Sequence, residues 1–332
     1  PVLSVQGLTT SFASRRGDVN AVSDVTFSMA RGERLAIVGE SGSGKSTLAL
    51  SLLKLLPRAG RISAGSVQLN GRDLIGLGED ELRHVRGKEV GVVFQDPMTS
   101  LNPVIRIRDQ MVPPICRHLK LTPAAAQSRA IELLAQVGIP DPAARISAYP
   151  HELSGGMRQR VLIAMALSCG PDLVIADEPT TALDVTIQAQ IVALLKGLAE
   201  HSGTSVLFVT HDFGLVARFA HTIAVMYAGR IVEYGPSERV FHRPEHPYTR
   251  ALLESIPAIT GPKPARLTQI DGVPPDLARL GPGCSFAPRC NRATDRCGEI
   301  RPELTVREPE HTAACWVSAD SPMKETAHVA VA

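Results

Sequence analysis

The fold of this chain is decided by one stretch, Gly39-Glu40-Ser41-Gly42-Ser43-Gly44-Lys45-Ser46-Thr47. It fits the pattern G-x-x-x-x-G-K-[ST], in which successive backbone N–H groups point into one concavity and hold a phosphate. The lysine supplies a positive charge for the β- and γ-phosphates, and the hydroxyl that follows it is placed to bind Mg²⁺. We therefore predict a nucleotide site, with Lys45 and Ser46 in these two roles.

The residues on either side of this loop fit the same site. Arg34–Val38 is a short apolar run and predicts a buried strand that leads directly into the loop. The run Leu48–Leu56 predicts a helix, whose positive N-terminal end would face the bound anion. A glycine-rich turn before a helix can occur without a ligand, but the strand, loop and helix together favour a phosphate cradle.

The composition is that of a soluble globular protein. Of its 332 residues, 44% are hydrophobic and 20% are charged, and the length allows one large domain or two unequal ones. The formal net charge of +2 is too small to indicate nucleic acid as the main partner. No apolar run approaches the roughly 20 residues of a membrane-spanning helix, and the first residues lack the order of a secretory signal. A chain that starts at Pro1 has either lost an initiator Met or is a piece of a longer protein.

Strand-like and helix-like stretches alternate through about the first 240 residues. The expected strands are Val2–Val5, Val19–Met29, Arg34–Val38, Ser66–Leu69, Val90–Phe94, Leu173–Ala176 and Ser205–Val209. The expected helices are Val104–Leu119, Pro123–Val137 and Val185–Glu200. This alternation predicts an α/β fold with a mostly parallel core sheet and an inserted helical piece.

The character of the sequence changes after Phe241. Eleven of the 25 prolines fall between Pro244 and Pro309, and that density breaks helices and central strands. We therefore expect a loop-rich appendage rather than a second regular domain. The expected organisation is a nucleotide-binding domain of residues 1–255 with a helical part at about 96–170, a C-terminal domain of residues 256–320, and a tail of residues 321–332.

Two carboxylates end one of the expected strands. Asp177 and Glu178 follow Leu173–Ala176, and in a phosphate-cradle fold we expect this strand beside the one that carries the loop. Asp177 would then hold Mg²⁺, directly or through water, and Glu178 could orient or deprotonate the attacking water. The alternative is a buried strand whose end is solvated by acids. The phosphate loop favours the Mg²⁺ role.

A second anion-binding signal lies upstream of this strand, in Leu153-Ser154-Gly155-Gly156. Ser154 can cap a helix that runs to about Ser168, and the two glycines expose the first N–H groups of that helix. A Ser-Gly-Gly triplet alone often marks only the start of a helix. Its position before an Asp-Glu strand makes it specific.

The order of these motifs resembles that of ABC transporter ATPases. The resemblance covers residues 1–255 and rests on the phosphate loop, Gln95 after a strand, the LSGG signature at 153–156, Asp177-Glu178, Ala182-Leu183-Asp184 as a D-loop, and His211 after a strand. It implies a P-loop NTPase fold of the ABC cassette type, with an antiparallel β subdomain and a helical subdomain beside the core sheet. It also implies an ATPase that uses ATP and Mg²⁺.

In that family two cassettes meet head to tail and hold ATP between them. The resemblance therefore implies that Ser154, Gly155 and Gly156 contact the nucleotide bound to the partner. Asp184 would cross the interface and couple the two sites. This chain keeps every catalytic position, and whether the partner's site is also active stays open.

The resemblance implies roles for three further residues. Gln95 would contact Mg²⁺ or water and report to the membrane subunit, and His211 would contact the γ-phosphate and help to fix the water. Phe12 is the aromatic residue expected to stack on adenine. Without the resemblance, Gln95 and His211 would be interpreted as polar residues at strand ends.

Two further stretches resemble the oligopeptide and dipeptide importers: Phe94-Gln95-Asp96-Pro97-Met98-Thr99-Ser100-Leu101-Asn102-Pro103 and His246-Pro247-Tyr248-Thr249-Arg250. They imply a peripheral subunit on the cytoplasmic face of the cell membrane. Its expected partners are a second cassette in a heterodimer, two permease subunits and an extracytoplasmic substrate-binding protein, with no nucleic acid. Peptides are the leading cargo, and nickel or another small solute is the alternative. On physical grounds alone, the second stretch is only a turn before a helix through Leu253.

A function of another class is a soluble ABC ATPase of DNA repair or translation. Such proteins typically carry C-x₂-C pairs, long coiled-coil insertions or two cassettes in one chain, and none of these features occurs in this sequence. A regulatory cassette without activity is disfavoured because every catalytic position is filled.

Four of the six cysteines, Cys284, Cys290, Cys297 and Cys315, fall in the proline-rich appendage. Clustered thiols in a segment without an evident core suggest a metal that holds the segment together. However, the spacing C-x₅-C-x₆-C with a distant fourth cysteine matches neither the common zinc sites nor the ferredoxins. Spacing alone leaves metal and no metal open. Cys116 and Cys169 lie in helical contexts and are expected to be small core residues.

The stretch Cys284-Ser285-Phe286-Ala287-Pro288-Arg289-Cys290 resembles the C-terminal segment of peptide importer ATPases. Some of those proteins bind a [4Fe–4S] cluster through four such cysteines. The resemblance therefore implies a structural or regulatory [4Fe–4S] cluster here, with zinc or no metal as the alternatives.

Overall fold

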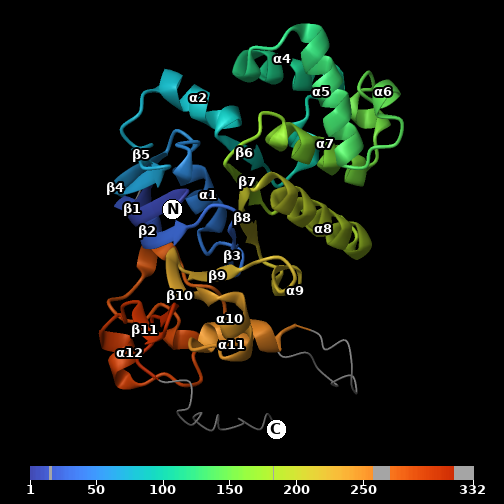
Figure 1. Ribbon diagram of the computed structural model, residues 1–332. Helices are drawn as coiled ribbons and strands as arrows, with labels where there is room; N and C mark the ends of the chain where they lie inside the picture. Colours follow the sequence, from blue (N-terminus) through green and yellow to red (C-terminus); the bar gives the residue numbers. More distant parts are fainter. Residues whose placement is uncertain (15–16, 182, 257–269, 318–332) are drawn as a thin grey trace, which may run out of the picture.

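Two β-sheets and a group of helices make up residues 1–14, 17–181, 183–256 and 270–317, the part of the chain that this computed structural model describes. In Figure 1 the N-terminal strands (blue), the helices from the middle of the chain (green) and the C-terminal residues (orange and red) lie around a central sheet. No helix within these ranges is both long and apolar enough to span a membrane.

Within the described residues, the larger sheet has five parallel strands at one side and antiparallel strands at the other. Its order is β6 (Val90–Val93), β7 (Leu173–Asp177), β8 (Ser205–Thr210), β3 (Arg34–Val38), β9 (Thr222–Tyr227), β10 (Arg230–Pro236), β12 (His311–Ala313) and β11 (Thr305–Glu308). The strands from β6 to β9 in this order pair in parallel, and the remaining pairs are antiparallel. This confirms the predicted mostly parallel core sheet.

One predicted neighbour relation is wrong. The strand that ends in the two acids, β7, does not lie beside β3, because β8 pairs with both strands and separates them. The prediction failed because the strand next to β3 comes later in the chain, through a crossover that local sequence does not reveal. The acids still reach the loop, since the carboxyl ends of parallel strands share one edge of the sheet.

The smaller sheet is antiparallel and confirms the predicted β subdomain. Its order is β2 (Gly17–Met29), β1 (Leu3–Ser14), β4 (Gly60–Leu69) and β5 (Arg72–Asp73). β1 and β4 are longer than the predicted Val2–Val5 and Ser66–Leu69. Their polar residues continue the pairing through register shifts, so the apolar runs mark only part of each strand.

The strands around the phosphate loop are buried on both faces. In β3, Leu35 and Ile37 belong to a core shared with the smaller sheet, whereas Ala36 and Val38 belong to a core shared with the helices. Successive side chains of a strand point to opposite faces, so a strand between two cores reads as a continuous apolar run. Burial on both sides fixes the end of β3, where the loop begins.

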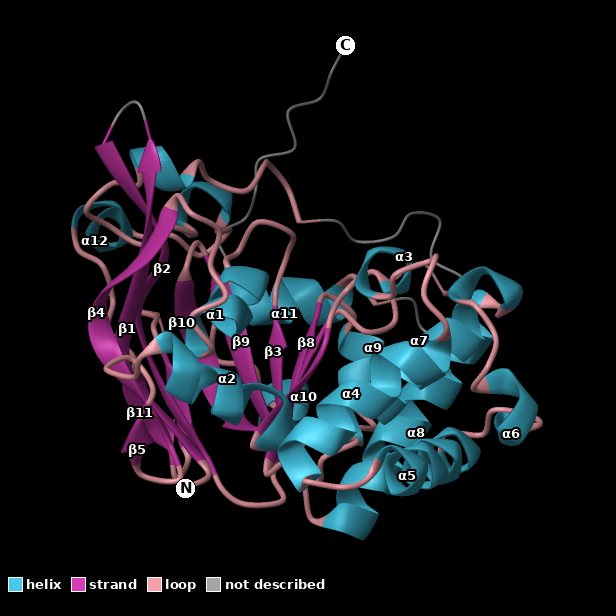
Figure 2. Cartoon of the chain, turned by 90° about the horizontal axis from the view of Figure 1, so that it is seen from above, coloured by secondary structure: helices cyan, strands magenta, loops and turns pink. Residues whose placement is uncertain are grey.

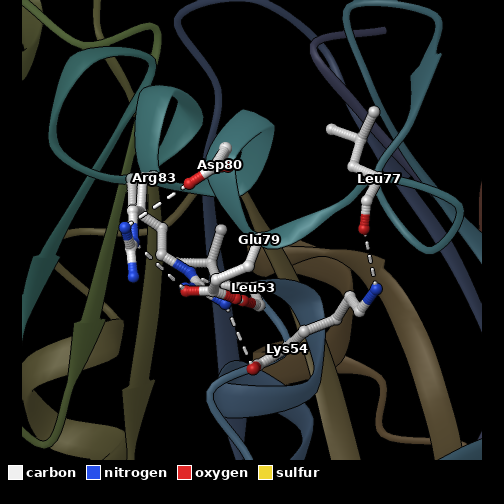
Figure 3. A network of polar contacts seen from close by, with 7 residues as sticks. Leu53, Lys54, Leu77, Glu79, Asp80 and Arg83 are labelled. Carbon is white, nitrogen blue, oxygen red and sulfur yellow. Dashed lines mark hydrogen bonds and ion pairs between the residues drawn. The ribbon is translucent and has the colours of Figure 1, made fainter.

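The helix after the loop, α1 (Lys45–Leu52), begins and ends earlier than the predicted Leu48–Leu56. Gly44 precedes it with a φ of 100°, and the N–H of Leu48 bonds to the Gly44 carbonyl (2.9 Å). The loop therefore runs directly into the first helical turn. The spacing of apolar residues could not indicate this early helix start, because the first turn is polar. After the helix, Lys54 has a φ of 51°, and its ammonium donates to the Leu77 carbonyl (3.0 Å; Figure 3).

Helices fill the segment between β6 and β7. They are α3 (Pro97–Ser100), α4 (Ile107–Leu119), α5 (Pro123–Gln136), α6 (Pro142–Arg145), the 3₁₀ turn η1 (Pro150–Glu152) and α7 (Gly155–Leu167), while α2 (Glu79–Lys88) precedes β6. α4 and α5 confirm the two predicted helices to within three residues. The helices α4 to α7 lie on the side away from the smaller sheet (Figure 2). α8 (Val185–Ser202) and α9 (Phe213–Val216) follow β7 and β8.

The residues beyond β10 are mostly turns and loops, as predicted, but they also extend the core. The regular pieces are α10 (Ser237–His242), α11 (Pro247–Glu254), the 3₁₀ turns η2 (Leu277–Arg279) and η3 (Ala287–Arg289), α12 (Asp295–Glu299), β11 and β12. β12 pairs with β10, so this segment adds two strands to the larger sheet. Phe286 joins the helical core, which the sequence did not predict. The predicted tail lies outside the described residues.

Candidate functional site

The phosphate loop lies against two strands of the core. A Cβ on Gly39 would lie 2.2 Å from the carbonyl oxygen of Met226 in β9, and one on Gly44 would lie 2.3 Å from the carbonyl oxygen of Ala21 in β2. No side chain fits at either position, which is why the loop needs glycine there. The close contact fixes the loop at the carboxyl edge of the sheet.

Lys45 is the buried cation of the loop, with 4% of its surface exposed. Its ammonium donates to the carbonyl oxygens of Gly39 (2.8 Å) and Glu40 (2.9 Å). Burial lowers the pKa of Lys45, and the nearby carboxylates of Glu178, Asp177 and Glu40 oppose that shift. A triphosphate would give this ammonium the anionic partner that it lacks in the loop.

Ser46 and Asp177 bring the loop and β7 together. The Ser46 hydroxyl donates to Oδ1 of Asp177 over 3.0 Å. Burial raises the pKa of Asp177, the hydrogen bond from Ser46 lowers it, and the neighbouring Glu178 raises it. A hydroxyl and a buried carboxylate beside a phosphate cradle fit Mg²⁺, which usually binds one or two carboxylates together with substrate phosphates.

The carboxylate of Glu178 collects polar groups from three segments. Gln95 donates to Oε2 over 2.9 Å, Thr181 donates to the same oxygen over 3.0 Å, and Nδ1 of His211 lies 3.3 Å from Oε1. The three predicted residues Gln95, Glu178 and His211 therefore meet. Glu178 has a φ of 44°, in the left-handed region that is rare for residues other than glycine.

A pocket of about 250 Å³ opens between the phosphate loop, Gln95 and Glu178. Its lining contains most of the residues predicted for the phosphates and the water: Ser41, Gly42, Gly44, Lys45, Ser46, Thr47, Gln95 and Glu178. The sequence did not predict two further lining residues, Ala21 and Leu277. The hydroxyl of Ser43 is buried next to the pocket with no hydrogen-bond partner among the described residues. A bound phosphate could supply that partner.

Phe12 does not line this pocket. A Cβ on Gly60 would lie 2.8 Å from its ring, so the ring packs against the backbone of β4. Its stacking on adenine stays a prediction.

The signature residues and Asp184 lie apart from the phosphate-loop pocket of their own chain, since none of them lines it. Ser154 accepts a hydrogen bond from the N–H of Met157 (3.3 Å) and caps α7, and Asp184 accepts from the N–H of Ile187 (2.9 Å) and caps α8. Ser154 and Gly155 are exposed to solvent. Ala182 of the expected D-loop lies outside the described residues.

The His-Pro-Tyr motif also reaches the loop, which sequence reasoning missed. The imidazole of His246 accepts a hydrogen bond from the N–H of Tyr248 (3.1 Å) at the start of α11, which confirms the turn before a helix. The fully buried Tyr248 then accepts at its hydroxyl a hydrogen bond from the N–H of Glu40 (2.7 Å). In the sequence, the aromatic residue of the motif, Tyr248, is the feature that could have indicated this contact.

The four appendage cysteines meet around one small cavity, which Cys284, Cys290, Cys297 and Cys315 all line. Burial raises the pKa of Cys284 to about 11 and also raises the pKa of Cys290 and Cys315. Within the described residues, no three Cys, His, Asp or Glu side chains form a group that could hold one metal ion. Cys169 is buried as expected, although it follows α7 in a turn.

Comparison with known proteins assigns this geometry to a family. Residues 22–181 match the family described as ABC transporter, and residues 232–297 match the family described as oligopeptide/dipeptide transporter, C-terminal region. The dipeptide transport ATP-binding protein DppD of Bacillus subtilis is 48% identical over 95% of this chain and 94% of its own length. The chain belongs to the oligopeptide/dipeptide branch of the ABC transporter family.

Other similar proteins agree with this assignment. The oligopeptide transport ATP-binding protein OppD of Bacillus subtilis is 48% identical to this ABC cassette over 98% of this chain and 91% of its own length. A solved structure, the dimeric post-hydrolysis state of the ATP-binding cassette MJ0796 bound to ADP and Pi, is 29% identical. It covers 71% of this chain and 98% of its own chain with a TM-score of 0.64. The cassette fold is therefore confirmed.

Proposed function

We propose that this chain is the ATP-hydrolysing subunit of a membrane importer for peptides. One observation carries the ATPase part: the phosphate loop, Gln95 and Glu178 line a single pocket, and Asp177 accepts a hydrogen bond from Ser46 of that lining. The peptide part rests on the similarity to DppD and OppD over nearly the whole chain.

The proposed reaction is the transfer of the γ-phosphoryl group of ATP to water. Lys45 and the loop N–H groups bind the phosphates, while Ser46, Asp177 and Gln95 would hold Mg²⁺, which would offset charge on the phosphoryl oxygens. Glu178 accepts the proton of the attacking water or orients that water, and His211 contacts the γ-phosphate. Glu178 already lies within reach of both Gln95 and His211, which supports this division of roles.

We further propose that a second cassette completes the site. Ser154, Gly155 and Gly156 lie outside the pocket of their own chain, and the first two are exposed at the start of α7. They are therefore available to the nucleotide of a partner, to which the helix N-terminus offers free N–H groups. The similar cassette MJ0796 is described as dimeric. We propose a heterodimer here, with Asp184 at the interface.

The segment of residues 94–105, which contains Gln95, supports contact with a permease on the cytoplasmic face of the membrane. Large apolar side chains are exposed there at Phe94 (40%), Val104 (78%) and Ile105 (39%). Apolar groups exposed together mark sites of protein interaction. When Gln95 moves toward or away from the γ-phosphate, this segment would move with it and transmit the change to two permease subunits. Those subunits would receive cargo from a substrate-binding protein.

The test is to reconstitute the complete assembly in lipid vesicles with its substrate-binding protein. We expect ATP hydrolysis together with uptake of labelled dipeptides or oligopeptides, both lost in Lys45→Ala. Uptake of nickel ions without peptides would overturn the cargo assignment. Absence of ATP hydrolysis in the intact assembly would overturn the ATPase itself.

We also propose a [4Fe–4S] cluster bound by Cys284, Cys290, Cys297 and Cys315. Their shared cavity brings four soft sulfur ligands together, and thiolates are the ligands that iron–sulfur clusters use. When bound, a cluster would hold this segment together and could respond to oxidation. ATP hydrolysis itself needs no electron transfer.

The cluster proposal is tested by anaerobic purification followed by iron and sulfide analysis. We expect about four irons per chain and a visible absorption band, both lost in Cys290→Ser. Cys169→Ser, which changes a cysteine outside the cavity, is the matched control and keeps the iron. Zinc, or no metal, in the anaerobic protein would contradict the proposal.

A further inference from the structure

Glu40, the second residue of the phosphate loop, is held on every side by polar contacts. Its N–H donates to the hydroxyl of Tyr248 (2.7 Å), and its carbonyl accepts from the ammonium of Lys45 (2.9 Å). Its carboxylate accepts two hydrogen bonds from the guanidinium of Arg289, at 2.6 Å and 2.9 Å. Two of these three partners come from the C-terminal segment, more than 200 residues along the chain.

Arg289 is itself rigidly placed. Its side chain is 5% exposed, and its Nε donates to the carbonyl of Asp271 (2.9 Å). The guanidinium lies 5.9 Å from the ring centre of Tyr227 and 6.0 Å from that of Phe286. A planar fork held in this way fits a carboxylate in one geometry only, which a lysine could not reproduce.

The same segment borders both the nucleotide pocket and the cysteine cavity. Leu277 lines the pocket together with Lys45, and Pro274 and Pro275 line a small cavity together with Ser41 to Ser43 of the loop. Arg289 is followed directly by Cys290 of the cysteine cavity. A rigid path of bonded groups therefore runs from the thiols to the residue that also bonds Lys45.

We propose that Arg289 is a positioning residue of the nucleotide site, through which the C-terminal segment sets the affinity for ATP. It holds the backbone of the loop through Glu40 and neutralises a carboxylate that would otherwise repel the triphosphate. This inference rests on the proposed ATPase function. It adds a coupling between the cysteine segment and the loop.

The charge of Glu40 decides whether substitution of Arg289 weakens or strengthens nucleotide binding. Without Arg289, the Glu40 carboxylate is left unpaired beside an anion site, so nucleotide binding weakens. Without both charges, the repulsion disappears as well, so the double variant binds better than the single one. The hold of Arg289 on the loop is lost in both variants, so the difference in affinity between them reports the unpaired charge of Glu40.

The experiment titrates the purified full-length chain and its variants with the magnesium complex of the non-hydrolysable analogue AMP-PNP. We expect Arg289→Met to weaken binding by roughly fivefold to tenfold, and the Glu40→Gln, Arg289→Met double variant to recover to within about threefold of the parent. Arg243→Met is the matched control. Arg243, directly after α10, also contacts the C-terminal strands, through Glu308 (3.4 Å), but it lines neither the nucleotide pocket nor the small cavity beside the loop. Its binding should equal that of the parent.

Hydrogen exchange gives a second readout, which is independent of measured affinities. Coupling is reciprocal, so AMP-PNP should slow amide exchange in residues 284–297 of the parent chain, and this protection should be lost in Arg289→Met. Unchanged exchange in the parent, or equal affinity in Arg289→Met, would overturn the coupling. A parent chain that binds no nucleotide would instead refute the proposed ATPase function.

Discussion

At the residue scale, Glu178 carries the largest share of the proposed chemistry. Its backbone sits at a φ of 44°, and its N–H is fixed by the Val209 carbonyl (2.8 Å). A residue held in this sparsely populated region costs about 1–3 kcal/mol and persists only where its surroundings enforce it. Here the strained backbone conformation directs the carboxylate toward Gln95 and His211, which is the arrangement that a water-activating group needs.

Glu178→Gln should separate binding from turnover. The amide has the size of the carboxylate but cannot accept a proton, so we expect ATP hydrolysis to fall by about 10² to 10⁴-fold while nucleotide affinity stays within a few-fold. Glu132→Gln, on the exposed face of α5, is the control and should leave both unchanged. Turnover at the parent rate in Glu178→Gln would remove this residue from the mechanism.

His246 should make stability depend on pH. Burial lowers its pKa to about 4, the Glu233 charge opposes that shift, and the Arg307 charge adds to it. Between pH 6.5 and about 4 the unfolded chain therefore binds a proton that the folded chain does not, so stability falls as pH falls through this window. The loss should reach about 3 kcal/mol at the acid end.

The variant His246→Asn isolates the pH dependence that His246 causes, because asparagine also caps helices but does not titrate. We expect the difference in unfolding free energy between parent and variant to shrink steadily from pH 7 to pH 4. A difference that stays constant with pH would show that His246 does not titrate in this way.

At the element scale, one buried acid joins the C-terminal strands to the core, in addition to the pairing of β12 with β10. Glu233 in β10 accepts hydrogen bonds from the N–H groups of Glu245 (2.8 Å) and His246 (2.9 Å), and Nε2 of His311 in β12 lies 2.8 Å away. It has no exposed surface. One carboxylate therefore joins β10, the start of α11 and β12.

Glu233→Ala should destabilise the fold strongly, because it leaves the buried donors around it without an acceptor. We expect the free energy of unfolding to fall by about 3–5 kcal/mol, measured by denaturant titration. Glu238→Ala, at an exposed position in α10, should change it by less than about 0.5 kcal/mol. Equal stability of the two variants would mean that Glu233 does not hold these elements together.

The sequence predicted some elements better than others, for physical reasons. β3 and β8 are apolar on both faces, so their runs coincide with the strands almost residue for residue. β11 and β12 escaped prediction because they are short and partly polar. The position of β8 between β3 and β7 depends on a crossover, and no local pattern encodes it.

The same limit applies to the site. The phosphate loop and the two acids could be predicted from local motifs, because the chemistry requires particular residue types at fixed spacings along the chain. The contacts of Glu40 with Tyr248 and Arg289 join residues 208 and 249 positions apart. Only the folded chain brings them together.

At the scale of the whole molecule, the loop and the signature are separate surfaces of one chain. The loop pocket is lined by residues of the core sheet edge, whereas Ser154 lies exposed at the start of α7, in the helical region. Two chains arranged head to tail would bring one surface of each kind to every nucleotide. Hydrolysis would then be coupled to closure of the pair, and closure to the permease.

The most direct test is a cryo-electron microscopy structure of the intact assembly carrying Glu178→Gln, prepared with Mg²⁺ and ATP. We expect ATP held between Lys45 of this chain and the signature serine of the partner cassette, with Ser154 of this chain against the partner's nucleotide. ATP at Lys45 with Ser154 still facing solvent in a fully loaded assembly would contradict this expectation.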